Sequence, residues 1–368
     1  MRVAFYAPLK APDHPVPSGD RQIAQLLFQA LRLAGFEPFL ASRLRSFDRD
    51  GDPPRQARLA RLGRLFADRL LRGWERCPQD APRLWFTYHL YHKAPDWLGP
   101  PVSAALGIPY VVCEASLAPK RAGGGWDIGH RAAEQAIRRA DAVIGLNPAD
   151  RACILPVLRN PERWVFLPPF LDVARFRPAR QAQPGPVRLV TVAMMRPGDK
   201  LASYRVLGRA LRLILDLPWT LDVIGDGPAR DEVVAALETV APRVRLRGAL
   251  PAERVADALA AADVFVWPAV NEAFGMALLE AQACGLPVVA GDSGGVEAVV
   301  AGGETGLLTP PGDEAAFAAA LRPLVIDPAR RAAMGSAARA KILREHDLPA
   351  AAERLRKAIG ELGTARAA

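Results

Sequence analysis

Two glutamates eight residues apart, Glu272 and Glu280, have a spacing that could hold one elongated, hydroxylated ligand at two points. Glu280 lies five residues beyond Gly275, which is roughly 7–8 Å along a helix at 1.5 Å per residue. Ionised carboxylates accept hydrogen bonds from hydroxyl groups. Taken alone, such a pair is more typical of a solvated helix face, so its interpretation depends on the neighbouring residues.

The neighbouring residues predict an anion-binding turn. Residues 263–267, which are apolar after Asp263, predict a strand, and Phe274-Gly275 opens a helical pattern that ends at Gly285. The backbone N–H groups around Ala273, Phe274 and Gly275 would then lie at the positive end of a helix, where a phosphate or a sugar hydroxyl can be held. A glycine at this point lets the ligand come close to the backbone.

Apolar, β-branched runs alternate with helical patterns along the whole chain. In the first half these runs begin near residues 3, 84, 110, 142 and 164, and in the second half near residues 187, 220, 244, 263 and 286. This alternation predicts βαβ units and parallel sheets. A proline-rich stretch, residues 167–186, separates the two sets and is interpreted as an interdomain linker.

These patterns predict an α/β protein with two Rossmann-like, doubly wound domains that face each other across a cleft. Ligands of such sheets bind at the carboxyl ends of the strands, so we expect a shared site. The predicted first domain is 1–180 and the predicted second domain is 187–345. A C-terminal helix, 346–368, could cross back to the first domain.

Length and composition exclude several classes of protein. The chain has 368 residues, too many for one small domain. Half of the residues are hydrophobic and 24% are charged, which is typical of a soluble globular protein. The start lacks a signal-peptide core and no apolar run reaches ~18 residues, so a cytoplasmic location is expected. Four widely spaced cysteines suggest neither a disulfide framework nor a zinc site, and the net charge of +9 favours anionic partners.

The segment 263–291 resembles the signature of the family 4 retaining glycosyltransferases, in which two glutamates are separated by seven residues and the fold is GT-B. The flanking sequences PAVNEAFG and EAQACGLPVVA are similar to the family pattern as well. The resemblance implies that Glu272 holds hydroxyls of the donor sugar and that Glu280 holds the ribose hydroxyls. Arg196 and Lys200 resemble the arginine and lysine with which the family neutralises the donor diphosphate.

Further segments resemble the family in the same order. The turn 223–230 is similar to its glycine-rich turn, which implies that Gly225, Asp226 and Gly227 lie near the nucleotide. Ser18-Gly19-Asp20 resembles the small-residue loop of the first domain. The chain departs from the pattern at Ala115, where the family usually places a histidine that contacts the donor sugar.

Three residues are open as replacements for that histidine: His89, His92 and Glu114. The candidate catalytic residues are therefore Glu272, Arg196, Lys200 and His89, and the candidate donor-binding residues are Gly19, Gly225, Asp226, Gly227, Ala273, Phe274, Gly275 and Glu280. A buried, hydrogen-bonded histidine in the core is the ordinary alternative for His89.

The resemblance implies transfer of a sugar from a nucleotide-diphosphate donor to a hydroxyl acceptor with retention. Front-face return, in which the departing phosphate accepts the acceptor's proton, needs no protein nucleophile. Neither a cofactor nor a metal is expected, since the side-chain cations would replace a divalent ion. Asp48, Asp50 and Asp52 have the alternating spacing of a calcium-binding loop. The twelfth position of such a loop is a glutamate, whereas here it would be Leu59, so we expect a solvated loop.

Residues 54–76 predict a basic amphipathic helix with Leu59, Leu62, Phe66, Leu70 and Trp74 on one apolar stripe. Such a helix could bring the protein to the inner membrane face and to a lipid-linked acceptor, or its apolar side could simply pack on a sheet. A polysaccharide-linked acceptor is also open. Nucleic acid is disfavoured, because no helix-turn-helix, aromatic-stacking or zinc signature accompanies the arginines.

Three alternative functions are considered. A nucleotide-sugar epimerase would need more acids and histidines in the cleft than this chain offers, and it would need no acceptor. A catalytically inactive GT-B-fold protein could serve as a binding or scaffold protein. An enzyme of the phosphorylase type would need a lysine in a Schiff-base context, which the sequence does not show.

Overall fold

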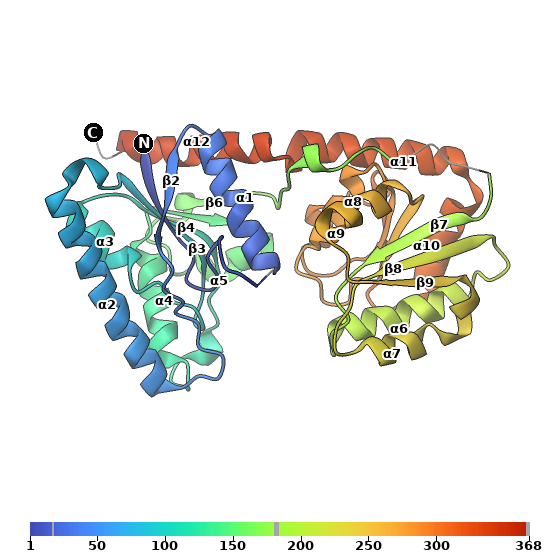
Figure 1. Ribbon diagram of the computed structural model, residues 1–368, viewed down its shortest axis with the longest axis horizontal. Coiled ribbons are helices and arrows are strands. Elements are labelled where there is room, and N and C mark those ends of the chain that lie inside the picture. The colour runs from blue at the N-terminus through green and yellow to red at the C-terminus, as the bar shows by residue number, and fades with distance from the viewer. Residues whose placement is uncertain (17, 180–183, 366–368) are drawn as a thin grey trace. The chain divides into compact units, whose positions relative to one another are not determined.

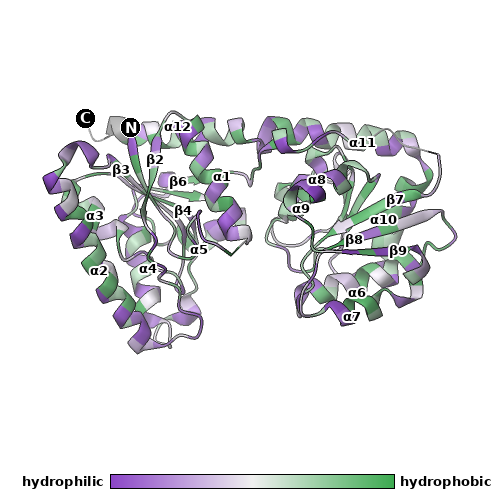
Figure 2. Cartoon of the chain, viewed as in Figure 1, coloured by the Kyte–Doolittle hydropathy of each residue, from purple (hydrophilic) through white to green (hydrophobic). Residues whose placement is uncertain are grey.

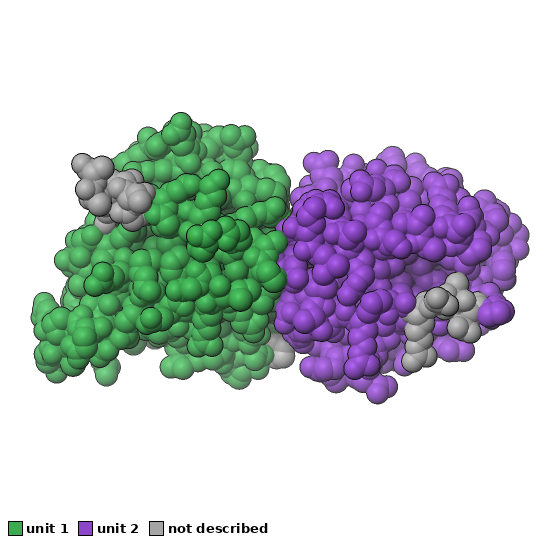
Figure 3. All heavy atoms as spheres, turned by 90° about the horizontal axis from the view of Figure 1, so that it is seen from above, with its two compact units in different colours: residues 1–168, 348–368 green, residues 169–347 purple. Residues whose placement is uncertain are grey.

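The computed structural model describes residues 1–16, 18–179 and 184–365 (Figure 1). It divides the chain into two compact units, which Figure 3 distinguishes by colour. Unit 1 comprises residues 1–168 and 348–368, and unit 2 comprises residues 169–347. Residues 180–183 of the predicted linker and 366–368 of the predicted C-terminal helix lie outside the described residues.

Unit 1 is built on a six-stranded parallel sheet in the order β2-β1-β3-β4-β5-β6. Its strands are β1 (Arg2–Tyr6), β2 (Glu37–Ser42), β3 (Leu84–Leu90), β4 (Tyr110–Ala115), β5 (Ala142–Gly145) and β6 (Trp164–Phe166). Its helices are α1 (Gly19–Leu33), α2 (Pro53–Arg76), α3 (Gly99–Leu106), α4 (Asp127–Arg139), α5 (Arg151–Ile154) and α12 (Leu348–Ala365). Successive side chains of β1 point to opposite faces of the sheet. Phe5 contacts Phe28 of α1 on one face, whereas Tyr6 lies on the other face, in the core that α2, α3 and α4 cover.

Unit 2 has the same architecture, with a parallel sheet in the order β12-β11-β10-β7-β8-β9. Its strands are β7 (Val187–Val192), β8 (Trp219–Ile224), β9 (Val244–Gly248), β10 (Val264–Trp267), β11 (Val288–Gly291) and β12 (Gly306–Thr309). Its helices are α6 (Asp199–Arg212), α7 (Arg230–Ala236), α8 (Ala252–Ala260), α9 (Met276–Ala283), α10 (Glu314–Ile326) and α11 (Pro328–Lys341). Two parallel sheets flanked by helices confirm the predicted fold class.

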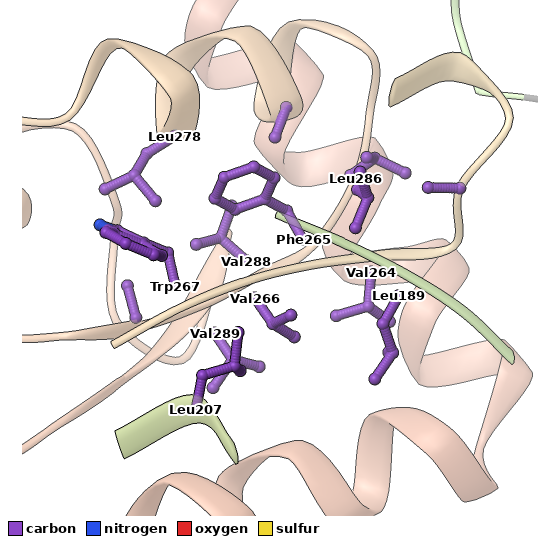
Figure 4. Packing of buried hydrophobic residues seen from close by; sticks show 14 of the residues in the cluster. Leu189, Leu207, Val264, Phe265, Val266, Trp267, Leu278, Leu286, Val288 and Val289 are labelled. Carbon is purple, nitrogen blue, oxygen red and sulfur yellow. The ribbon is translucent and has the colours of Figure 1, made fainter. Parts of the chain in front are cut away.

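The central strand β10 is buried on both faces, which explains why its sequence is a continuous apolar run. Figure 4 shows Phe265 directed toward Leu278 and Leu286 on one side of the strand. Val266 points to the other side, toward Leu207 of α6. The core packing of β10 therefore fixes the point at which the polar loop after Trp267 begins.

The boundary between the units lies at Pro168, twelve residues before the predicted end of the first domain. Leu171 and Val173 are buried in the core of unit 2. The N–H of Leu171 donates to the carbonyl of His346 (2.9 Å), and the N–H of Val173 donates to Asp347 Oδ1 (3.1 Å). The first part of the proline-rich stretch is thus packed structure. The C-terminal helix α12 belongs to unit 1, where it contacts α1.

Helix α2 buries a different face from the predicted one. Its buried residues are Gln56, Ala60, Gly63, Ala67 and Trp74. A Cβ on Gly63 would lie 2.2 Å from the Cβ of Trp97, so small residues are needed where α2 meets its neighbours. Of the predicted stripe only Trp74 is fully buried; Phe66 is 39% exposed, and Leu65 beside it is 56% exposed. Apolar and hydrophilic residues alternate along the helix (Figure 2).

Among the described residues, no helix combines the length and the apolar character that a membrane crossing requires.

Candidate functional site

Lys200 and Glu272 form an ion pair at the carboxyl ends of two adjacent strands of unit 2. Lys200 lies in the first turn of α6, which follows β7, and Glu272 lies in the loop after β10. Lys200 Nζ binds Glu272 Oε2, and Trp267 Nε1 donates to the same oxygen at 3.1 Å. The side chains of Lys200 and Glu272 are only 28% and 16% exposed. The pair is therefore partly shielded from water, which strengthens its electrostatic interactions.

The loop that carries Glu272 is held in an unusual backbone conformation. Ala269 and Asn271 have φ angles of 50° and 53°, a region that residues with a side chain adopt at a cost of about 1–3 kcal/mol each. The Glu272 N–H donates to Ser293 Oγ (3.0 Å), and Ser293 Oγ donates to the Ala269 carbonyl. These contacts preset the position of the Glu272 carboxylate.

Helix α9 begins without a side-chain cap. Gly275 occupies the N-cap position with φ 71°. No acceptor within the described part of the chain takes the N–H groups of Ala273, Phe274 or Gly275. The side chain of Phe274 packs against the core of unit 2, so only its backbone is available to a ligand. The predicted strand, turn and helix are present, and the helix end can receive an anion.

Glu280 lies on α9, half-buried, between Gly275 and Cys284. Burial, reinforced by the charge of Glu280, raises the pKa of the Cys284 thiol to about 12. The cysteine therefore remains protonated at neutral pH, in keeping with a structural role.

Gly225 and Gly227 are required by the neighbouring backbone. Their φ angles are 144° and 153°. A Cβ on Gly225 would lie 1.9 Å from the carbonyl oxygen of Ala193, and one on Gly227 would lie 2.3 Å from that of Met195. The Met195 N–H donates to the Asp226 carbonyl at 2.9 Å. The glycine-rich turn thus fixes the segment after β7, and its approach to a nucleotide stays a prediction.

Arg196 lies in that segment and is exposed. Within residues 1–16, 18–179 and 184–365, its guanidinium has neither a hydrogen-bond acceptor nor an ion-pair partner. Arg196, Lys200 and the open end of α9 together place positive charge at the carboxyl ends of β7 and β10. Such an arrangement suits a phosphate or diphosphate group.

A second polar cluster occupies the strand ends of unit 1. His89 Nδ1 lies 3.0 Å from Asp20 Oδ1. His89 and Glu114, near the ends of the adjacent strands β3 and β4, have φ angles of 62° and 58°. Burial opposes protonation of His89, but Glu114, Asp20 and Asp150 outweigh it and raise the pKa of the imidazole. The adjacent His89 lowers the pKa of Asp20.

The three candidates for the missing histidine fall into two groups. His89 and Glu114 belong to one cluster, and one Glu114 oxygen, Oε2, is buried without a hydrogen-bond partner in the described structure. His92 lies apart, beside Trp126. Ala115 is itself 2% exposed and packs in the core.

Gly19 is the first residue of α1, and a Cβ there would have no neighbour within 4 Å. Its close approach to a sugar therefore remains a prediction.

The sequence analysis missed Asp150. This residue ends the 3₁₀ helix η3 (Pro148–Asp150) after β5, and burial followed by the charge of Glu114 raises its pKa to about 6. Its position shortly after the strand predicted near residue 142 is the sequence feature that could have identified it as a site residue.

The expectation of a solvated loop at Asp48 was wrong. Asp48 is 2% exposed, and its carboxylate accepts from the N–H groups of Asp50 (3.3 Å) and Asp52 (2.9 Å) and from Gln56 Nε2 (2.8 Å). The carboxylate organises the turn before α2.

Comparison with known proteins reveals relatives in one family. Residues 186–327 match the sequence profile of the family described as Glycosyl transferases group 1. A D-inositol 3-phosphate glycosyltransferase of Kineococcus radiotolerans is 34% identical over 236 residues, or 56% of this chain and 54% of that protein. The chain thus spans about half the length of this relative. An alpha-maltose-1-phosphate synthase of Mycolicibacterium smegmatis is 30% identical over 328 residues, or 80% of this chain and 82% of that protein.

Solved structures share the fold over nearly the whole chain. A sucrose-phosphate synthase from Thermosynechococcus elongatus superimposes with a TM-score of 0.74 at 22% identity, covering 99% of this chain and 100% of that chain. The Anabaena protein Alr3699/HepE in complex with UDP gives a TM-score of 0.72 at 17% identity, covering 98% and 100%. At these identities the likeness establishes the architecture alone.

The matched regions contain the residues described above. The profile match at 186–327 includes Arg196, Lys200 and both glutamates of the pair. An alignment of 328 residues is longer than either unit and so extends into both. The chain belongs to the group 1 glycosyltransferases.

Proposed function

We propose that the protein is a retaining glycosyltransferase that moves a sugar from a nucleotide-diphosphate donor to a hydroxyl acceptor. The observation that carries this proposal is the partly buried Lys200–Glu272 ion pair, with Arg196 and the uncapped end of α9 beside it. This arrangement offers cations for a diphosphate and a carboxylate for sugar hydroxyls within one small region of unit 2.

The ion pair also suggests how the site responds to the donor. Without an anion, Lys200 neutralises Glu272. A bound diphosphate offers Lys200 a second, more highly charged partner, which leaves oxygens of Glu272 able to accept hydrogen bonds from the sugar. Arg196 and the N–H groups of α9 would stabilise the growing charge on the leaving diphosphate. Glu280 would hold the ribose hydroxyls.

In this proposal no side chain attacks the sugar. The departing phosphate accepts the proton of the acceptor hydroxyl on the same face, so that configuration is retained. The side-chain cations take the place of a divalent ion, and no cofactor takes part beyond the donor itself. We assign to His89, whose Nδ1 lies 3.0 Å from Asp20 Oδ1, the role that the family usually gives to a histidine at the position of Ala115.

Solved neighbours suggest the first donors to test. The Anabaena protein Alr3699/HepE was crystallised with UDP, with UDP and glucose, and with UDP-glucose. The names of two sequence relatives, a D-inositol 3-phosphate glycosyltransferase and an alpha-maltose-1-phosphate synthase, each contain a phosphate ester. We therefore start from UDP-sugars as donors and phosphorylated polyols or sugars as acceptors.

The deciding experiment is thermal unfolding with a panel of UDP-, ADP- and GDP-sugars, followed by product analysis. A donor at 100 times its Kd stabilises the folded protein by about 2.7 kcal/mol, which raises the unfolding temperature by several degrees. We expect one nucleotide to stand out and the sugar to reach an acceptor with its anomeric configuration kept. A new sugar formed without an acceptor would indicate an epimerase, and no shift with any donor would favour a scaffold protein.

We further propose that α2 contacts an anionic membrane surface and thereby brings unit 1 to a lipid-linked acceptor. Arg58, Arg61, Leu65, Arg69, Arg72 and Arg76 are exposed and repeat at helical spacing on the side away from the buried face. Leu65 and Phe66 add exposed apolar surface beside the arginines, which suits a lipid interface better than a nucleic acid.

We expect the protein to float with vesicles of phosphatidylglycerol and phosphatidylcholine and to bind pure phosphatidylcholine weakly. The double variant R58Q/R61Q should lower binding at least tenfold, since each arginine near an anionic surface contributes about 1 kcal/mol. R131Q/R138Q removes the same charge from α4, where both arginines are ion-paired, and serves as the control. Equal loss in both variants would mean that net charge alone acts, and the α2 surface would be rejected.

A further inference from the structure

The loops that follow β3 and β4 in unit 1 gather basic side chains around one indole ring. Arg121 Cζ lies 4.5 Å and Lys93 Nζ lies 5.0 Å from the centre of the Trp126 ring. The His92 ring meets the same indole edge-on, with 5.9 Å between ring centres. We call these four residues the Trp126 cluster.

His92 lacks a partner for either ring nitrogen. Both Nδ1 and Nε2 are buried, and no group among the described residues forms a hydrogen bond with them. Arg121 Nε is buried and unpartnered as well. Burial, together with the charges of Arg121, Lys93 and His130, lowers the pKa of His92 to about 4. Buried polar atoms normally have partners, so this set calls for a missing acceptor.

The acids closest along the chain do not provide that acceptor. The carboxylate oxygens of Asp48 already accept hydrogen bonds from the N–H groups of its own turn and from the side chain of Gln56. Asp127 accepts from the Gly123 N–H (2.8 Å) and pairs with Arg131 (2.8 Å). In the described ranges, the exposed Asp50 and Asp52 form no ion pair with either cation of the cluster. The cluster therefore carries positive charge without a counterion.

Hydrogen bonds and close packing hold the backbone of the Trp126 cluster in place. Gln56 Nε2 donates to the Gly125 carbonyl (2.7 Å), and Gln56 Oε1 accepts from the Gly129 N–H (2.9 Å). The ring of Trp126 packs closely on Gly51, where an added Cβ would lie 2.8 Å from the nearest ring atom. The N–H of Asp48 donates to the Lys93 carbonyl at 2.8 Å. The backbone at the indole and at Lys93 is therefore fixed before any ligand binds.

We propose that the Trp126 cluster binds a phosphate group, and that this group belongs to the acceptor substrate. The proposal rests on the proposed function, because it names the chemical class of the acceptor. The Arg121 guanidinium can donate two hydrogen bonds to phosphate oxygens, and Lys93 adds a point charge. His92 gains a proton and a hydrogen-bond acceptor when the anion arrives. Ligands of doubly wound sheets bind beyond the strand ends, where this cluster lies.

Histidine NMR tests the binding directly, since the chain has only five histidines. At pH 6 and constant ionic strength, His92 should be neutral in sodium chloride. Inorganic phosphate should raise its pKa by about two units, so that at pH 6 its Cε1–H resonance moves about halfway to the imidazolium position. Glucose 1-phosphate should act like phosphate, and glucose should have no effect. An unchanged His92 in phosphate, or a response to free phosphate but not to the ester, would overturn the proposal.

The variant R121Q separates this site from the donor site. It should weaken phosphate binding at least tenfold and should raise the pKa of His92 in the absence of phosphate, because a neighbouring cation is gone. R138Q changes the charge of the same unit by the same amount, at an arginine that is ion-paired with Glu134, and should do neither. R121Q should keep the stabilisation by nucleotide sugars. If no nucleotide sugar binds to any variant, the proposed function fails while the NMR result on phosphate still stands.

Discussion

Replacing Lys200 with alanine is expected to lower kcat/KM for the donor by about 10²–10³-fold, the effect of removing one preorganised group that stabilises transition-state charge. The variant should still fold, because Lys200 lies at the end of the sheet, outside the hydrophobic core of unit 2. Trp267 Nε1 would remain as a partner of Glu272 at 3.1 Å. Initial rates over a range of donor concentrations, together with a thermal unfolding curve, measure both effects.

Three further variants sharpen this test. E272Q keeps the size of the side chain and removes its charge, so we expect a loss of similar order with an unchanged fold. K200R restores a cation and should recover part of the activity. K341A breaks an ion pair with Glu345 in the turn Ile342–His346 that follows α11 and should leave activity intact. Full activity in both K200A and E272Q would refute the assignment.

Gly225→Ala is expected to destabilise unit 2 by about 3 kcal/mol or more. The new methyl group would meet the Ala193 carbonyl oxygen at 1.9 Å, and the φ of 144° disfavours any side chain. Backbone strain and overpacking each cost about 1–3 kcal/mol. Urea denaturation gives the change in the free energy of unfolding.

Gly248→Ala is the matched control. Gly248 accepts the N–H of Gly225 at 2.9 Å and has φ 66°, but a Cβ there would meet nothing within 4 Å. The control should therefore lose only about 1–2 kcal/mol, the cost of a left-handed backbone for an alanine. If both variants lost the same free energy of unfolding, close packing against Ala193 would not explain why position 225 requires a glycine.

The interior strands could be predicted from sequence because both of their faces are buried. Strand β10, Val264–Trp267, is apolar throughout, and the helix with Gly275 at its N-cap follows it as expected. Strands β2 and β12 escaped prediction. Both lie at an edge of a sheet and their apolar runs, PFLA and LL, are short. Edge position alone does not explain the difference, because the edge strands β6 and β9 were predicted from the runs near residues 164 and 244.

Contacts between distant residues could not be predicted from local patterns. Lys200 and Glu272 are 72 positions apart and meet because β7 and β10 are neighbours in the sheet. Asp150 joins His89 and Glu114 for the same kind of reason, through the ends of strands that lie side by side. The buried face of α2 was mispredicted because close helix packing selected small residues such as Gly63 over the leucines.

The order of the two units along the chain has a consequence for synthesis on the ribosome. Unit 1 is interrupted by unit 2, and its helix α12 is translated only after the whole of unit 2. Domains generally fold as units while the chain emerges. The inserted unit can therefore mature while residues 1–168 still await α12 as the cover for α1. Until α12 has been translated, the face of α1 that α12 contacts stays uncovered, so unit 1 can complete its fold only after unit 2 has been synthesised.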